Sequence, residues 1–316
     1  MSTTHQTLGI AINQIETLHL NGVDQRYCVL GEKPENPVLL YLHGGPGDSC
    51  LPLVKKYNSA LARHFNLVVW DQRGAGLSYY PFTEENHPSI DTYVEDTYQL
   101  SRYLLERFHQ DKLYLMGHSW GSALGVKFIQ VHPELVHHYI DSGQVVNMQA
   151  ITREQIAFVR SHTSDAKALA FLDSYSEAIA GQDWVKALLK LTKLVVKHGG
   201  SLYGRSNMSN LIWPFLTSGR YSIKELLNRQ KGSMQSVTYL WHELMDTDFT
   251  DIHHFEVPVT FCEGRQDHHV SSAIAHDWYV AIDSPKSWYW FDHSGHFPKW
   301  EEPDHFLGCV LQDLSR

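Results

Sequence analysis

A serine placed between two glycines is the part of the chain best suited to chemistry. Residues 117–121 read Gly-His-Ser-Trp-Gly, with an apolar run at 113–116 before them and a helix-forming stretch at 122–131 after them. This order is typical of a nucleophile elbow, a sharp strand-to-helix turn that exposes the serine hydroxyl at the sheet edge. We therefore expect Ser119 to be a nucleophile. The alternative is an ordinary serine in a glycine-rich turn.

A serine hydroxyl becomes nucleophilic when a base, oriented by a carboxylate, removes its proton. After a nucleophile elbow the acid comes next in the chain and the histidine last, each on a loop that follows a strand. Asp267 follows an apolar, strand-like run at 257–262, and His296 follows another at 287–291. We expect Asp267 and His296 to complete a catalytic triad with Ser119.

Four neighbouring residues compete for these roles: His268, His269 and His293 for the base, of which His293 is the main rival, and Asp292 for the acid. His293 also follows the strand at 287–291, but Gly295 allows a tight turn directly before His296 and favours the later histidine. Asp292 lies too close to both histidines in the sequence to reach around an imidazole ring. Substitution of each histidine can test this choice.

An oxyanion hole is the other part that acyl transfer requires. The loop at 43–47 reads His-Gly-Gly-Pro-Gly and follows an apolar run at 38–42. Such loops donate a backbone N–H to the tetrahedral intermediate. Pro46 has no N–H, so we expect Gly45 to donate, together with the N–H of Trp120 directly after the nucleophile. A plain Gly-Pro turn is the alternative.

The elements that must position these residues alternate between strand and helix. A hairpin at 15–30, turned at Asn21-Gly22, opens a series of strands separated by helices, the first of them at about 53–64. This alternation predicts a mostly parallel sheet. The alternation stops near Gly143 and resumes near 256. We expect an α/β fold with a core at 1–142 and 256–316.

The segment at 143–255 is predicted to be an all-helical cap, or lid, over the carboxyl edge of the sheet, where open α/β sheets place their sites. Two pairs have the spacing of capping boxes, Thr152 with Gln155 and Ser222 with Glu225. Glycine ends many helices, and we expect Gly181, Gly199-Gly200 and Gly232 to end helices here.

Composition excludes several classes of function. The chain has 316 residues, 43% of them hydrophobic, and a formal net charge of -9, which disfavours a nucleic-acid partner. It contains no apolar stretch long enough to cross a bilayer, and residues 1–14 lack the features of a secretory signal. Four scattered cysteines are typical of reduced thiols. We expect a cytoplasmic protein; the sequence predicts no oligomeric state.

The 21 histidines raise the question of a metal site. Adjacent pairs such as His137-His138 point to opposite sides of an extended chain and cannot easily share an ion. His242-Glu243 begins like a zinc-protease motif, but Asp246 stands where the second histidine is required. We expect neither a metal nor a cofactor.

Several motifs together make the chain similar to a known family. They are the loop at 43–47, Asp-Gln-Arg-Gly-Ala-Gly-Leu-Ser at 71–78, the serine elbow, His-Pro-Glu at 132–134 and Gly-Arg-Gln-Asp at 264–267. In this order they resemble the proline iminopeptidase group of α/β-hydrolases, over residues 16–142 and 256–312. The resemblance implies an α/β-hydrolase fold with the triad and oxyanion residues given above, and a structural role for the motif at 71–78.

The resemblance also implies how a substrate is held. Members of that group bind the substrate's α-amine with lid glutamates and pack its proline ring against aromatic side chains. Glu243 is the first candidate for the amine, followed by Asp246 and Glu225. Trp241, Trp213 and Phe215 are the candidates for an apolar pocket. The alternatives are solvated carboxylates on helix surfaces and aromatic side chains that belong to the core.

Three functions remain from the sequence. The first is a serine aminopeptidase that releases an N-terminal residue, preferably proline, from short peptides. The second is a carboxylesterase that acts on small acyl esters with the same triad. The third, a hydrolase-like protein that only binds a ligand, does not require an intact triad and oxyanion loop.

Overall fold

The computed structural model describes residues 13–219 and 221–314. The prediction that residues 1–14 are not a signal peptide therefore falls mostly outside the described residues. In this part of the chain eight strands form one sheet in the order β1-β2-β4-β3-β5-β6-β7-β8. Only the pairs β1–β2 and β2–β4 are antiparallel, which confirms the predicted hairpin and the mostly parallel sheet. The strands are β1 Ile15–Leu20, β2 Val23–Leu30, β3 Val38–Leu42, β4 Asn66–Asp71, β5 Leu113–Ser119, β6 Val136–Gln144, β7 Val259–Gly264 and β8 Lys286–Phe291.

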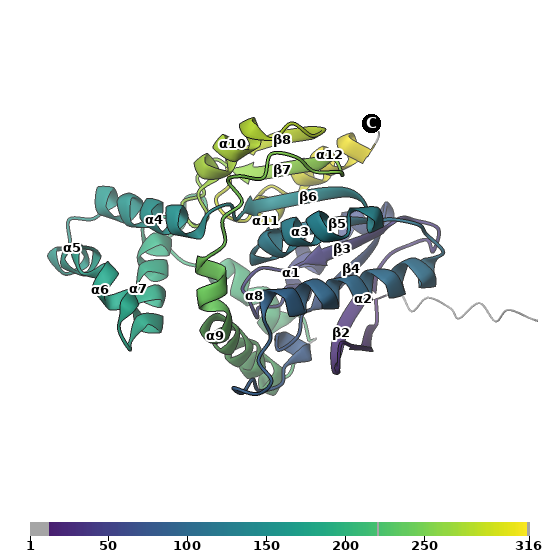
Figure 1. Cartoon of the computed structure of the whole chain (residues 1–316), viewed down its shortest axis with the longest axis horizontal. Helices are drawn as coiled ribbons and strands as arrows, with labels where there is room; N and C mark the ends of the chain where they lie inside the picture. The colour runs from purple at the N-terminus through teal and green to yellow at the C-terminus, as the bar shows by residue number, and fades with distance from the viewer. Residues whose placement is uncertain (1–12, 220, 315–316) are drawn as a thin grey trace, which may run out of the picture.

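Helices cover both faces of the sheet and enclose two apolar cores. One face packs against α2 (Ile90–Phe108), α3 (Trp120–Val131) and α10 (Ser272–Ala281), of which α2 and α3 lie in front of the sheet in Figure 1. The other face packs against α1 (Leu51–Tyr57), α11 (Pro298–Glu301) and α12 (Pro303–Leu314). Strands β3 and β4 are buried along their whole length; β3 is apolar throughout, and β4 is apolar between its polar end residues, Asn66 and Asp71.

The helix at 53–64, which the apolar pattern favours as one piece, is broken in the structure. It consists of α1 and a short 3-10 helix at Ser59–Arg63, with Asn58 between them. The Asn58 side chain donates a hydrogen bond to the carbonyl of Lys299 at 2.8 Å. This buried contact with a distant segment fixes the break, which explains why local periodicity does not reveal it.

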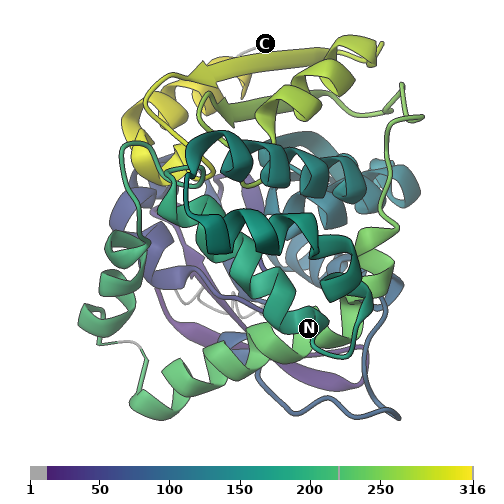
Figure 2. The same ribbon diagram turned by 90° about the vertical axis from the view of Figure 1, so that its left-hand side faces the viewer.

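Between β6 and β7 the described residues form six helices: α4 (Met148–His162), α5 (Ala166–Asp173), α6 (Tyr175–Ala180), α7 (Trp184–Lys197), α8 (Ser209–Thr217) and α9 (Ile223–Met245). Helices α5, α6 and α7 form an arm that extends away from the sheet on the left of Figure 1. Seen from that side in Figure 2, the teal and green helices lie in front of the sheet. The arm has a small apolar core of its own, which includes Leu172, Tyr175 and Leu191.

The helix signals of this segment have different outcomes. Gly181 ends α6, and Gly199-Gly200 follows the end of α7, as predicted. Ser222 and Glu225 form the predicted capping box of α9. The prediction for Thr152 is wrong, because α4 begins earlier and Asn147 caps it by accepting the N–H of Ala150 at 2.7 Å. The prediction for Gly232 is also wrong: it lies inside α9, where any Cβ would collide with the backbone carbonyl of Gly74.

Candidate active site

Ser119 lies at the turn between β5 and α3, where the sequence places the nucleophile elbow. Its backbone has φ 54° and ψ -122°, a strained conformation for a residue that is not glycine, and its side chain is half-buried. A Cβ at Gly121 would collide with the carbonyl of Leu42 at the end of β3. Only glycine permits this approach of helix and strand, so the predicted elbow geometry is confirmed.

Asp267 and His296 meet in a buried hydrogen bond, with 2.7 Å between Asp267 Oδ2 and His296 Nδ1. The other oxygen of Asp267 accepts the N–H groups of His269 and Val270 at 2.8 and 2.9 Å. Burial raises the pKa of Asp267, whereas these N–H groups lower it. The His296 ring is only 2% exposed, so Asp267 fixes both its position and the proton on Nδ1.

His293 and Asp292, which compete for the roles of base and acid, have other partners. His293 is exposed, and its N–H donates to Glu302 at 2.9 Å. Asp292 forms an exposed ion pair with Arg265 at 2.5 Å. Of the candidate acids and bases, the structure therefore brings together Asp267 and His296.

Two further imidazoles contact the ring of His296: His118, which sequence patterns did not single out as a site residue, and His269, which they indicated only as a rival for the base. His118, the residue before the nucleophile, is 4.7 Å from the His296 ring between ring centroids, and His269 is 4.8 Å away on a stacked ring. Burial lowers the pKa of all three rings, that of His269 to about 4. Burial thus favours the neutral form of each ring, which suits a general base. The cluster joins residues 118, 269 and 296, so no local spacing could have revealed it.

Both expected oxyanion donors are placed where a backbone N–H can be offered. Trp120 is the first residue of α3, so its N–H has no partner within the helix, and Gly45 is exposed on its loop. Gln72 connects α3, which begins at Trp120, with the loop at 43–47. It accepts the indole N–H of Trp120 at 2.8 Å, and its own N–H donates to His43 Nε2 at 3.1 Å. Gln72 thus links α3 to the loop at 43–47, a contact that the motif at 71–78 did not disclose.

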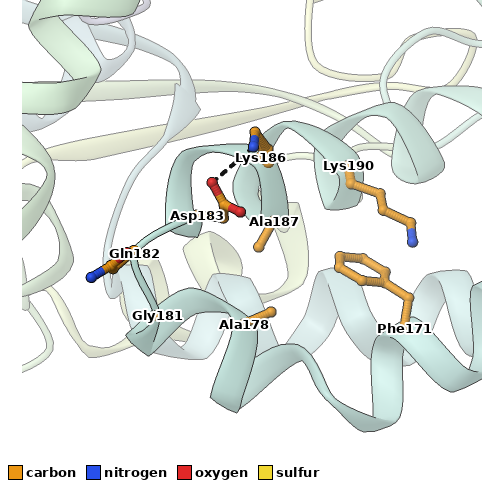
Figure 3. Close-up of a pocket in the computed structure, with 8 residues that line it drawn as sticks. All are labelled: Phe171, Ala178, Gly181, Gln182, Asp183, Lys186, Ala187 and Lys190. Atoms are coloured by element: carbon orange, nitrogen blue, oxygen red, sulfur yellow. Dashed lines mark hydrogen bonds and ion pairs between the residues drawn. The ribbon is translucent and has the colours of Figure 1, made fainter.

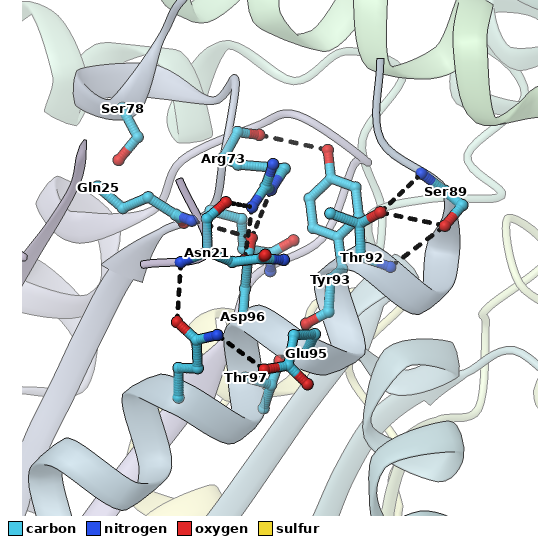
Figure 4. Close-up of polar contacts among 12 residues, drawn as sticks. Asn21, Gln25, Arg73, Ser78, Ser89, Thr92, Tyr93, Glu95, Asp96 and Thr97 are labelled. Atoms are coloured by element: carbon cyan, nitrogen blue, oxygen red, sulfur yellow. Dashed lines mark hydrogen bonds and ion pairs between the residues drawn. The ribbon is translucent and has the colours of Figure 1, made fainter. Parts of the chain in front are cut away.

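The arginine of the same motif has a structural role, as the resemblance implies. Figure 4 shows Arg73 directed at Asp96 of α2, with two N–H groups each 2.6 Å from a carboxylate oxygen. Arg73 also donates to the carbonyl of Asn21 at 3.1 Å, and Tyr93 donates to the carbonyl of Arg73 at 3.3 Å. This buried pair locks the loop after β4 onto α2 and the hairpin.

The helical segment touches the loops that carry Asp267 and His296. The N–H of His296 donates to the carbonyl of Ser201 at 2.8 Å, and the Ser201 hydroxyl is 2.9 Å from His269 Nδ1. On α4, a Glu154 carboxylate oxygen lies 3.6 Å from His268 Nδ1. Residues between α7 and α8, together with α4, therefore adjoin the candidate active site.

Glu243 does not have the environment expected of an amine-binding residue. It is exposed on α9, and its carboxylate accepts the N–H of Ile90 at 2.8 Å. The N–H groups of a first helical turn lack partners within their helix, and Glu243 supplies one for α2. Glu225 is occupied in the capping box of α9, and Asp246 is exposed at the end of that helix. The expectation for Glu243 is corrected accordingly.

The three aromatic candidates have unlike surroundings. Trp241 is buried and stacks on Trp184 with 5.4 Å between ring centroids. Phe215 is buried against Tyr221, with the guanidinium of Arg229 4.0 Å from its ring centroid. Both behave as core residues. Trp213 is 62% exposed, so the structure does not support a pocket role for it.

A surface pocket lies on the distal arm, as Figure 3 shows, rather than at the triad. Its lining includes Phe171, Lys186 and Lys190, with the Lys190 ammonium 4.0 Å above the Phe171 ring. None of the residues proposed for catalysis lines it. In the described part of the chain no group of three metal-ligating side chains could hold an ion. None of its helices is long and apolar enough to span a membrane.

Comparison with known proteins agrees with this fold. A family model described as alpha/beta hydrolase fold matches residues 37–303. The chain belongs to the α/β-hydrolase fold family. It is 32% identical to a probable aminopeptidase, YbaC, of Bacillus subtilis, over 94% of each chain. It is 22% identical to a proline iminopeptidase of Lactobacillus helveticus, over 93% of this chain and 95% of that one.

Solved structures show the same α/β-hydrolase fold. The proline iminopeptidase of Mycobacterium smegmatis superposes with a TM-score of 0.72 at 17% identity, over 96% of this chain and 98% of that one. VinJ gives the same TM-score at 16% identity. The chain is thus a proline iminopeptidase-like α/β-hydrolase, and it is a hydrolytic enzyme.

Proposed function

We propose that this hydrolase is a serine aminopeptidase that releases an N-terminal residue, proline or a similar one, from short peptides. The observation that carries the proposal is the buried bond of 2.7 Å between Asp267 and His296, beside an elbow that holds Ser119. The peptidase names of the relatives support the substrate class.

In this proposal the Ser119 hydroxyl attacks the carbonyl of the first residue, and His296 Nε2 takes its proton. Asp267 keeps the other ring nitrogen protonated and stabilises the imidazolium. The N–H groups of Gly45 and Trp120 stabilise the oxyanion. The imidazolium then protonates the departing peptide amine, and water repeats the sequence to release the amino acid and restore Ser119.

We also propose the division into a core at 1–142 and 256–316 and a helical cap at 143–255. The contacts of Ser201 with His296 and His269 support a cap that helps to enclose the site. Strand β6 continues to Gln144, so its last two residues belong physically to the sheet.

Glu154 replaces Glu243 as the proposed partner of the substrate's α-ammonium. It is a half-buried carboxylate on a cap helix, and it faces the loop that carries Asp267. An ammonium bound there forms a charge-assisted hydrogen bond worth about 1.5–3 kcal/mol. The alternative is a carboxylesterase, which needs no carboxylate to bind an α-ammonium. The surroundings of Glu243, which do not suit amine binding, favour this alternative.

The experiment compares proline p-nitroanilide, its N-blocked form and p-nitrophenyl acetate as substrates. We expect the free-amine substrate to be preferred by the wild type. Glu154→Gln should lower kcat/KM for that substrate by about 10- to 150-fold, the equivalent of the lost bond. It should leave the acetate ester nearly unchanged, because that substrate has no ammonium.

Glu243→Gln is the matched control, since it makes the same chemical change on a neighbouring cap helix. It should leave the ratio of kcat/KM for the two substrates unchanged. Preference of the wild type for blocked or ester substrates would replace the aminopeptidase with the esterase. An equal loss on both substrates in Glu154→Gln would remove the role of Glu154.

A further inference from the structure

The loop that carries the proposed oxyanion donor Gly45 is held at its two ends by different parts of the molecule. At its start, His43 belongs to the core: it is buried, and its Nε2 accepts the N–H of Gln72 at 3.1 Å. At its far end, Gly47 and Asp48 lie against α9 of the helical segment. The mechanism proposed above gives α9 no part in catalysis.

The backbone of Gly45 rests directly on the far end of this loop. A Cβ on Gly45 would lie 2.7 Å from the backbone nitrogen of Gly47 and 2.9 Å from that of Asp48. Contacts this short leave no room for a side chain, so the two stretches of backbone are packed against each other. A shift of Asp48 therefore moves Gly45, whose N–H is proposed to bind the oxyanion.

Gly47 in turn rests on α9. A Cβ on Gly47 would collide with the carbonyl oxygen of Gly232 and with the hydroxyl oxygen of Ser236. Arg229, Gly232 and Ser236 follow the spacing i, i+3, i+7 and therefore lie on one face of α9. This face is the one that packs against the oxyanion loop.

An ion pair holds the end of the loop on that face. The Nε atom of Arg229 lies 2.5 Å from Oδ1 of Asp48, which also accepts the N–H of Ser49 at 2.8 Å. The guanidinium lies 4.0 Å from the ring centroid of Phe215 in α8, and this contact restricts its orientation. Both charged side chains are half-buried, and such pairs add little to stability. The main effect of the pair is on where the loop lies.

Helix α9 is itself anchored to the loop after β4. The side-chain amide of Gln235 donates to the carbonyls of Gly74 at 3.3 Å and Tyr80 at 2.9 Å. Its oxygen accepts the N–H of Phe82 at 3.1 Å. These three hydrogen bonds fix the helix, so Arg229 holds Asp48 from a fixed support.

We propose that Arg229 is a positioning residue for the oxyanion hole. Its ion pair with Asp48 ties the loop of Gly45 to α9, so the helical segment contributes to stabilisation of the transition state. The inference rests on the roles that the proposed function gives to Gly45 and Ser119, but not on whether the natural substrate is a peptide or an ester.

The test compares p-nitrophenyl acetate with its thionoester, in which sulfur replaces the carbonyl oxygen. Sulfur is a weak hydrogen-bond acceptor, so a working oxyanion hole favours the oxygen ester. Arg229→Met should lower kcat for the oxygen ester by about 10-fold, a part of the roughly 10²–10³-fold that loss of a whole donor costs. It should lower kcat for the thionoester much less and leave KM for both esters unchanged, whereas general damage to the site would affect both esters equally.

A double-mutant cycle shows whether the two side chains act together. Asp48→Asn keeps an oxygen that can accept the N–H of Ser49 but removes the charge, so it should match Arg229→Met. The double variant should lose no more than either single variant, because both remove the same interaction. Arg229→Lys keeps the charge and should lose less. Lys231→Met, the same loss of charge on an exposed side chain of α9, should behave as the wild type.

The outcomes separate this inference from the proposed function. A wild type that turns over neither the esters nor proline p-nitroanilide would reject the proposed function. An active wild type whose preference for the oxygen ester is unchanged in Arg229→Met and Asp48→Asn would reject the positioning role alone. Additive losses in the double variant, or equal losses on the two esters, would reject it as well. Thermal unfolding of each variant, in which Tm should hardly change, provides the control for folding.

Discussion

The carboxyl edge of the sheet and the helical segment that adjoins it differ in how closely their geometry follows the sequence. At the edge, the backbone of Ser119 and the bond between Asp267 and His296 are what the motifs predict. In the helical segment, Glu243 and Trp213 have surroundings other than those expected. A strand-turn-helix motif fixes its own geometry, whereas a side chain on a helix takes its role from whatever packs against it.

The largest expected difference at the edge is between two histidines three residues apart. His296→Ala should lower kcat by about 10⁴-fold, because serine and histidine act as one unit. His293→Ala should stay within a few-fold of the wild type, since that residue is exposed and bonded elsewhere through its backbone. Both are measured by single-substrate kinetics on folded protein.

Circular dichroism of both variants provides the control for folding. A larger loss of kcat in His293→Ala than in His296→Ala would give the base role to His293. The site residues at the sheet edge would then be predicted no better than those of the helical segment. Equal, small losses in both variants would exclude either histidine as the base.

A smaller effect should separate two glycines that lie inside helices. Gly232 of α9 faces the loop at Gly74, whereas Gly308 of α12 has open space around it. Gly308→Ala should stabilise the protein by about 1 kcal/mol through helix propensity. Gly232→Ala should destabilise it by about 1–3 kcal/mol, because the new methyl group forces α9 from the loops after β3 and β4.

Thermal unfolding with activity measured in parallel checks this pair. A rise in Tm for both variants would show that α9 is not tightly packed on those loops. It would also weaken the view that packing against distant loops, and not local sequence, determines the roles of side chains in the helical segment.

Much of the fold could be predicted from periodicity. The hairpin, the parallel strands and the capping box at Ser222 follow from local patterns, and the structure contains them. The break at Asn58 and the course of α9 through Gly232 could not be predicted, since both depend on contacts with residues far away in the chain.

The same limit applies to the site. The elbow, the oxyanion loop and the pairing of Asp267 with His296 follow from short motifs and chain order. The link made by Gln72 and the contacts of His118 and His269 with the ring of His296 depend on tertiary packing. Nothing in the spacing of these residues distinguishes them from ordinary core positions.

The central claim is that Ser119 is the nucleophile of a working triad. Mass spectrometry of the protein after reaction with a fluorophosphonate tests it most directly, with turnover of the best substrate measured in parallel. We predict one modified residue, Ser119, in the wild type, with no labelling in Ser119→Ala and a loss of about 10⁴-fold or more in kcat. Modification of another residue, or wild-type turnover by Ser119→Ala, would contradict the account.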